Sequence, residues 1–307
     1  MFGFGKKTND LVKLLPIVKG KYRCNEPMSK HTWFAVGGPA EVMFSPEDDG
    51  DLSLFLKTRP YNVPICVIGG GSNLLVRDGG IPGVVIKLES RFYRGYSLTE
   101  GELTCGAGMR NAELKKIMLE NKLGGLEFLV SIPGHLGGAV RTNAGCFGKE
   151  LKDVLLRATV MNGDGEIREV PAADLSLSYR HSLFPDDWIV TSLTFKVYLQ
   201  APEETLKIMT EHKNYRIKNQ PHNVRTAGST FKNPHGLKAW ELIKKSGCAD
   251  LRVNKAKVSE KHCNFLVNEG GASASDIENL GEKIIEKVKN ATSITLEWEI
   301  KRIGINK

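Results

Sequence analysis

Residues 65–76 read ICVIGGGSNLLV, in which Gly69-Gly70-Gly71-Ser72-Asn73 separates two apolar runs. Short apolar runs bounded by glycine predict two strands joined by a tight turn. Three glycines remove the side chains that would keep a ligand away from the backbone N–H groups. A concave row of such groups binds phosphate well. Residues 69–73 are therefore a candidate turn for holding a diphosphate.

The residues after this turn exclude two common phosphate motifs. A Rossmann fingerprint needs a glycine at position 74 and then a helix, whereas this chain has Leu74 and another strand-like run. A P-loop needs Gly-Lys-Ser or Gly-Lys-Thr after the glycines, and neither follows. The turn alone is also compatible with a glycine-rich hairpin that holds no ligand.

A second glycine-rich segment favours a ligand site. Residues 131–140 read SIPGHLGGAV, and Asn143-Ala144-Gly145 follows closely. The glycines allow close backbone approach, and Pro133 and Asn143 are typical of fixed turns. We therefore expect the two segments to line opposite sides of one extended cofactor.

Composition indicates an ordinary globular protein. The chain has 307 residues, of which 41% are hydrophobic and 25% charged, so it is long enough for two domains. The formal net charge of +8 is spread along the chain without an arginine-rich run. This distribution favours phosphate-bearing small ligands over nucleic acid. A monomer is expected.

Targeting and cysteine patterns point to the cytoplasm. The apolar stretch 11–18 is interrupted by Lys13 and Pro16, and no cleavage site follows it. No other segment approaches the roughly 18 apolar residues that a membrane-spanning helix needs. The six cysteines lie far apart, which predicts reduced thiols, most of them buried, and no metal site.

The pattern of the chain changes near residue 200. Before it, apolar runs predict strands at 64–68, 84–88, 103–105, 157–161 and 189–199, and helical spacing predicts a helix at 111–121. After it, predicted helices at 203–216, 238–246 and 276–289 alternate with predicted strands at 229–232, 263–268 and 294–300. We therefore predict an α+β protein with a strand-rich domain over 1–200 and a smaller α/β domain over 201–307. Ser273 or Ser275 is expected to cap the last helix.

Over nearly all its length the chain resembles the UDP-N-acetylenolpyruvoylglucosamine reductases of bacterial cell-wall synthesis, in their shorter subclass. The stretches that carry the resemblance are 31–34 with 37–40, 69–73, 132–139, 143–145, 178–184, 228–234, 258–265 and 296–299. It implies a vanillyl-alcohol-oxidase-like (PCMH-type) fold with non-covalent FAD, and a C-terminal domain that binds the UDP-sugar. NADPH would reduce FAD, and the flavin N5 would then pass hydride to the methylene carbon of the enolpyruvyl ether. Protonation of the neighbouring carbon would give UDP-N-acetylmuramate.

The same resemblance assigns site residues. Ser229 matches the proton donor, while Arg180 and Glu299 match the pair that stabilises the charged intermediate, with Glu297 as a competing carboxylate. Lys232 and Asn233 match contacts to the substrate diphosphate. The matched cofactor residues are Gly69, Gly70, Gly71, Ser72, Asn73, Ile132, Pro133, Gly134, Gly137, Gly138 and Asn143. Without the family, Ser229 would be interpreted as a turn residue, Arg180 as a surface ion-pair residue, and Glu299 as a solvated strand residue.

Two departures from the family pattern leave questions open. At 253–256 the family usually has a glycine pair, so this loop is expected to turn differently. His135 stands where a small hydroxyl residue is common, which raises the question of whether it touches the flavin phosphates. The rival interpretations are another PCMH-type flavoenzyme acting on an alcohol or sugar, and a basic protein without enzymatic activity.

Overall fold

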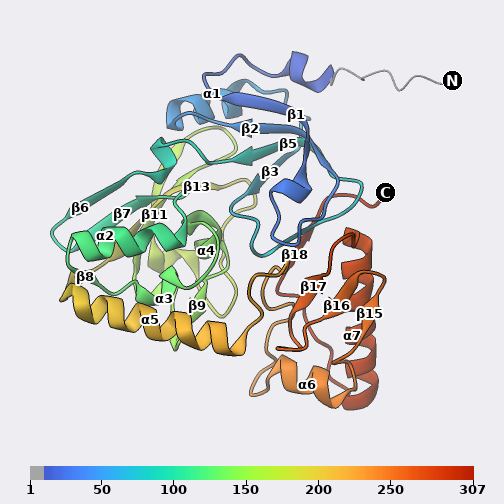
Figure 1. Ribbon diagram of the computed structural model, residues 1–307. Coiled ribbons are helices and arrows are strands. Elements are labelled where there is room, and N and C mark those ends of the chain that lie inside the picture. Colours follow the sequence, from blue (N-terminus) through green and yellow to red (C-terminus); the bar gives the residue numbers. More distant parts are fainter. Residues whose placement is uncertain (1–9) are drawn as a thin grey trace.

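The computed structural model describes residues 10–307 and forms two bodies (Figure 1). The larger body contains two sheets and several helices that cover them. The smaller body, drawn in orange and red, contains a short sheet and the two helices α6 and α7. The last strand, β18 (Lys301–Ile303), leaves the smaller body and pairs with β4 (Leu74–Val76) of the larger body. This strand pair lies at the seam, the boundary between the two bodies.

The first sheet carries the glycine turn at the end of one of its strands. Its order is β1 (Lys21–Pro27), β2 (Pro39–Ser45), β5 (Ile81–Lys87) and β3 (Ile65–Ile68). β1 runs antiparallel to β2, whereas β2, β5 and β3 are parallel. Both faces of the sheet are buried: Phe44 belongs to one core cluster and its neighbour Met43 to another. Asp48 caps the N-terminus of α1 (Asp49–Thr58), because its side chain accepts a hydrogen bond from the Asp51 N–H.

The second sheet is antiparallel throughout. Its order is β12 (Ile167–Pro171), β11 (Leu155–Met161), β13 (Ile189–Lys196), β7 (Glu102–Gly106) and β6 (Tyr96–Thr99). Around it lie α2 (Leu114–Glu120), α3 (Glu127–Val130), α4 (Leu136–Arg141) and α5 (Pro202–Asn219). Two short pairs complete the body, β9 (Gly145–Cys146) with β10 (Lys149–Glu150) and β8 (Leu123–Gly124) with β14 (Tyr198–Leu199). One hydrophobic core joins both sheets.

Helix α5 packs on the larger body although it follows residue 200. Met209 belongs to the core of that body, and the buried hydroxyl of Thr205 donates to the Leu123 carbonyl at 3.0 Å. The division at 200/201 stays a prediction, and these contacts favour a boundary after Asn219. Residues 1–9 of the predicted first domain lie outside the described part of the chain.

The smaller body is an α/β unit around its own core. Its elements are α6 (Ala239–Lys245), β15 (Arg252–Val253), β16 (Ala256–Val258), β17 (Leu266–Asn268) and α7 (Ala274–Thr292). Val253 pairs with Ala256, so the loop in question is a two-residue hairpin turn with Asn254 at a φ of 48°. β18 (Lys301–Ile303) pairs in parallel with β4 (Leu74–Val76), the strand that follows the glycine turn.

Most predicted elements are confirmed, including the strand, turn and strand over 65–76 and Ser273 as the cap of α7. Three predicted strands are wrong in whole or in part. Residues 229–232 and 294–300 form no strand, because they make only isolated bridges such as Phe231 with Trp298, and 263–268 is a strand only from Leu266. The six cysteines are free as predicted, but only Cys105 and Cys248 are buried.

Candidate active site

The two glycine segments face each other, as expected from the sequence. The hydroxyl of Ser72 donates to the Pro133 carbonyl at 3.0 Å. A Cβ placed on Gly70 would lie 3.0 Å from the Gly134 Cα, and one on Gly69 would lie 3.8 Å from the Gly138 Cα. The backbones of the two segments therefore approach one another at van der Waals distance.

Glycine is required at the centre of this arrangement. Gly71 has a φ of +67°, and a Cβ there would lie 1.9 Å from the carbonyl oxygen of His31. A Cβ on Gly138 would meet no atom within 4 Å, so this glycine borders open space. Within residues 10–307, the N–H groups of Gly70, Gly71 and Ser72 have no hydrogen-bond acceptor. Unpaired N–H groups beside open space suit an anionic ligand.

A cavity of about 410 Å³ adjoins the turn. Gly69, Gly137 and Gly138 form one part of its wall, and Arg59 and Arg141 lie in the remainder. This volume is in the range of natural ligand pockets. His135 also lines the cavity, and burial, together with the nearby Lys87 charge, lowers the pKa of its imidazole. A neutral His135 ring therefore lies against Gly70 at the wall of this cavity.

Two buried asparagines fix the second segment. Asn111 donates from its side chain to the Ile132 carbonyl at 3.1 Å. The Asn143 amide donates to Glu150 and to the Ser178 carbonyl, and its oxygen accepts from the Lys152 N–H. Asn143 is fully buried, so both of its donors are used within the protein. Its side chain supports the loop before Arg180, and a direct contact of this side chain with a cofactor is not favoured.

Arg180 and Glu299 meet across the seam between the bodies. The Arg180 Nε lies 2.7 Å from the Glu299 Oε1, and the two side chains are 21% and 18% exposed. Arg180 also donates to the Gly145 carbonyl at 3.0 Å and lies over the Tyr179 ring. Burial raises the pKa of the Glu299 carboxyl above its usual range, and Arg180 and then Lys232 oppose that rise.

Ser229 is brought close to this pair by a backbone hydrogen bond of the residue that follows it. The Glu299 N–H donates to the carbonyl of Thr230, the next residue after Ser229, at 2.8 Å. The Glu299 carbonyl accepts from the side chain of Asn73 at 3.2 Å. One carboxylate residue thus connects the glycine turn with the Ser229 segment. The Ser229 hydroxyl forms no hydrogen bond within the described chain, so it is available to a ligand.

The other predicted site residues occupy different environments. Glu297 is 75% exposed and pairs with the Lys232 ammonium at 3.4 Å, so the two acids do not share one environment. The Asn233 side chain accepts from the Ala239 N–H at the start of α6. The Asn233 N–H donates to the Tyr179 hydroxyl at 3.4 Å. The roles of these residues toward a substrate stay predictions.

Sequence reasoning missed several residues that build the site. The His31 carbonyl forces glycine at 71, Asn111 holds the second segment, and Tyr179 packs on Arg180. Of these, only Asn111 gave a local signal, as a polar residue at the first position of the predicted helix. Among residues 10–307, no group of His, Cys, Asp or Glu could hold a metal ion, and no helix could cross a membrane.

Comparisons with known proteins agree with this arrangement. A family model described as an FAD binding domain matches residues 40–171. A second, described as UDP-N-acetylenolpyruvoylglucosamine reductase, C-terminal domain, matches residues 220–303. The first covers both glycine segments and the second covers Ser229 and Glu299.

Individual relatives match over nearly the whole chain. A UDP-N-acetylenolpyruvoylglucosamine reductase of Bradyrhizobium sp. is 46% identical, covering 97% of each chain. One of Parvibaculum lavamentivorans is 46% identical, covering 98% of this chain and 96% of the relative. The crystal structure of the reductase from Thermus caldophilus has a TM-score of 0.80 at 34% identity, covering 93% of this chain and 99% of that one.

Proposed function

The chain belongs to the family of UDP-N-acetylenolpyruvoylglucosamine reductases, and we propose from this how its own residues perform the reaction. The reaction reduces the enolpyruvyl ether of UDP-N-acetylglucosamine-enolpyruvate to UDP-N-acetylmuramate in peptidoglycan synthesis. The protein is an FAD-containing oxidoreductase of the PCMH type, with NADPH as electron donor.

The glycine segments fit the FAD diphosphate. Gly70, Gly71 and Ser72 offer unpaired N–H groups, and Gly138 leaves space in front of them. We assign them to the diphosphate, with Asn73, Ile132, Pro133, Gly134 and Gly137 shaping the same wall. Bound FAD, once reduced by NADPH, supplies the hydride that adds to the methylene carbon of the substrate.

Arg180 and Glu299 carry the electrostatic part of the proposal. Hydride addition places negative charge on the neighbouring carbon and the substrate carboxylate. The Arg180 guanidinium can donate to such an oxyanion without reorganising, because Glu299 and the Gly145 carbonyl already hold it. Glu299 keeps the guanidinium aimed into the site through the 2.7 Å ion pair, although burial raises the pKa of its carboxyl.

Ser229 is assigned as the proton donor to that carbon. A serine hydroxyl is a weak acid, but a carbanion-like centre is a much stronger base, so donation is downhill. In the described part of the chain the hydroxyl has no hydrogen-bond partner to give up before it donates. The observation that carries the whole proposal is Glu299, which contacts Arg180, Asn73 and the Thr230 carbonyl at once.

Lys232 and Asn233 are proposed to meet the UDP diphosphate of the substrate. Lys232 is 32% exposed, and within residues 10–307 its ammonium pairs with the exposed Glu297 alone, so it can exchange this carboxylate for a phosphate of the substrate. We also propose that the protein acts as a monomer in the cytoplasm and binds no nucleic acid. The even spread of basic and acidic residues supports the last point.

The test separates the two half-reactions. Ser229→Ala should leave the rate of flavin reduction by NADPH nearly unchanged and lower the rate of reoxidation by the enolpyruvyl sugar nucleotide by about 100-fold or more. Glu299→Gln should behave likewise, whereas the matched Glu297→Gln should leave both rates near those of the wild type. Equal loss of both half-reactions in Ser229→Ala, or a larger effect at Glu297 than at Glu299, would contradict these roles.

A further inference from the structure

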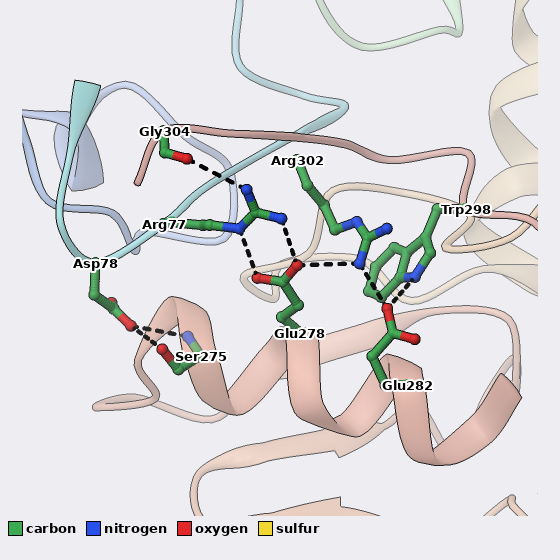
Figure 2. Close-up of polar contacts among 8 residues, drawn as sticks. All are labelled: Arg77, Asp78, Ser275, Glu278, Glu282, Trp298, Arg302 and Gly304. Carbon is green, nitrogen blue, oxygen red and sulfur yellow. Dashed lines mark hydrogen bonds and ion pairs between the residues drawn. The ribbon is translucent and has the colours of Figure 1, made fainter. Parts of the chain in front are cut away.

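Trp298, the residue before Glu299, is seated on a glycine of α7 (Figure 2). A Cβ on Gly281 would lie 2.2 Å from the indole Cζ2 and 2.3 Å from Cη2, so the ring occupies the space of the missing side chain. The Phe231 ring lies against the indole, with the ring centres 5.3 Å apart. Glycine in the middle of a helix costs about 1 kcal/mol relative to alanine. Contact with the indole accounts for a glycine at this position.

Charged groups hold the edge and the face of the same ring. The indole N–H donates to Glu282 at 3.0 Å, and the Arg302 guanidinium lies 4.6 Å from the ring centre. Arg302 also bonds Glu282 at 2.6 Å and Glu278 at 3.0 Å. The indole is therefore held between two elements: Gly281 and Glu282 of α7 contact it on one side, and Arg302 of β18 covers its face.

The same group of contacts reaches the glycine turn of the larger body. Glu278 pairs with both Arg302 and Arg77, and Arg77 directly follows β4. Asp78 accepts from the Ala274 and Ser275 N–H groups at 2.9 Å, so a residue of the larger body adds to the cap that Ser273 forms on α7. Figure 2 shows these contacts meeting along one side of α7. The helix that carries Gly281 is thus anchored next to the strand that leaves the turn.

No strand ladder holds the backbone around Glu299. Residues 294–300 lie in no sheet; Leu296 and Ile300 pack in the core of the smaller body, and hydrogen bonds join Glu297 to Lys232 and Glu299 to Thr230 and Asn73. Trp298 contacts α7, while Glu299 contacts Arg180 in the larger body. Successive side chains of an extended segment point to opposite sides, so fixing one fixes the direction of the next.

We propose that Trp298, seated on Gly281 and held by Arg302 and Glu282, is the positioning residue that sets Glu299 against Arg180. The inference rests on the proposed function, because it acts only through Glu299. A ring displaced from Gly281 would rotate the segment and move the Glu299 carboxylate away from the guanidinium. Displacements of about 1 Å in such a group can cost about 100-fold in rate.

The experiment uses Gly281→Ala in the full-length, FAD-loaded protein, with Lys283→Ala on an exposed position of the same helix as control. Alanine favours the helix itself, so a loss of rate cannot come from helix propensity. We expect reoxidation by the enolpyruvyl sugar nucleotide to slow about tenfold to 100-fold. Flavin reduction by NADPH and the FAD content should match those of the control.

A double-mutant cycle shows whether the effect passes through Glu299. Gly281→Ala should slow reoxidation further by less than about twofold in a Glu299→Gln background. Trp298→Phe, whose smaller ring leaves room for the alanine methyl group, should restore part of the rate in Gly281→Ala. If Gly281→Ala does not fold, Trp298→Leu replaces it in the same cycle.

The outcomes separate the two claims. An equal slowing by Gly281→Ala in both backgrounds would overturn the positioning role while leaving the role of Glu299 intact. An unchanged rate in Gly281→Ala, with a slow Glu299→Gln, would do the same. A normal rate in Glu299→Gln alone would overturn both the proposed role of Glu299 and the inference built on it.

Discussion

Replacing Arg180 by methionine removes the one guanidinium that, among residues 10–307, bonds the largely buried Glu299 carboxylate. For unit charges 2.7 Å apart, an effective dielectric constant of about 20 gives about 6 kcal/mol of attraction. Part of that attraction offsets the cost of burying both groups. Removing one partner of a buried pair therefore costs about 3–5 kcal/mol. For a chain of this length the midpoint of thermal unfolding should fall by roughly 5–8 °C near neutral pH.

The loss should depend on pH in a defined direction. Without Arg180, burial raises the pKa of Glu299 still further above its unfolded value, so the folded state binds the proton more readily than the unfolded state. The destabilisation is then complete above the folded pKa and fades as the pH falls through it. Thermal unfolding followed by circular dichroism near pH 8 and near pH 5 should show the deficit shrinking at the lower pH.

Two variants complete this test. Arg180→Met with Glu299→Gln should be more stable than Arg180→Met alone, because the buried charge has been removed. Arg168→Met breaks an exposed pair with Glu166 and should cost less than about 1 kcal/mol. A deficit that stays constant with pH, or a double variant no more stable than Arg180→Met, would refute the account of a buried ion pair.

Four further changes test other parts of the molecule. Gly71→Ala should purify with less FAD per chain, judged by visible absorbance, because the methyl group meets a backbone carbonyl at 1.9 Å; full occupancy would count against the turn as the diphosphate site. Asn143→Ala should lose about 1–3 kcal/mol in urea unfolding, since it removes three hydrogen bonds of a fully buried amide; an unchanged midpoint would contradict this. Asp78→Ala should lose about 1 kcal/mol, because the first two N–H groups of α7 lose their acceptor while Ser273 still caps the third; no loss would show that these two bonds are dispensable. Glu297→Gln should keep its steady-state rate within about twofold, as expected for a group 75% exposed, and a large loss would move the catalytic role to it.

The glycine turn was predictable because everything that defines it is local. Two apolar runs, three glycines and the absence of a following helix pattern all lie within residues 65–76, and β3 and β4 follow them as expected. The second glycine segment was predictable for the same reason. The contact between the two glycine segments joins residues far apart in the sequence. Their similar composition was the only feature of the sequence that indicated it.

The pair that we propose to be catalytic could not come from local pattern. Arg180 and Glu299 are 119 residues apart, and only the resemblance to a known family joined them. The wrong strands at 229–232 and 294–300 have a related cause. Their apolar alternation is real, but the two segments meet through single bridges and backbone bonds around Glu299 and do not form a continuous ladder. Helix α5 was predicted correctly as a helix. The spacing of its apolar residues, however, did not indicate that it would pack in the core of the larger body.

The central claim is that a flavin held by these glycine segments delivers its electrons to an enolpyruvyl sugar nucleotide. The most direct measurement is to reduce the purified enzyme with NADPH without oxygen, add UDP-N-acetylglucosamine-enolpyruvate, and follow the visible absorbance of the flavin. We predict that the oxidised spectrum returns and that UDP-N-acetylmuramate forms in equal amount. A flavin that stays bleached in the presence of this substrate would contradict the account.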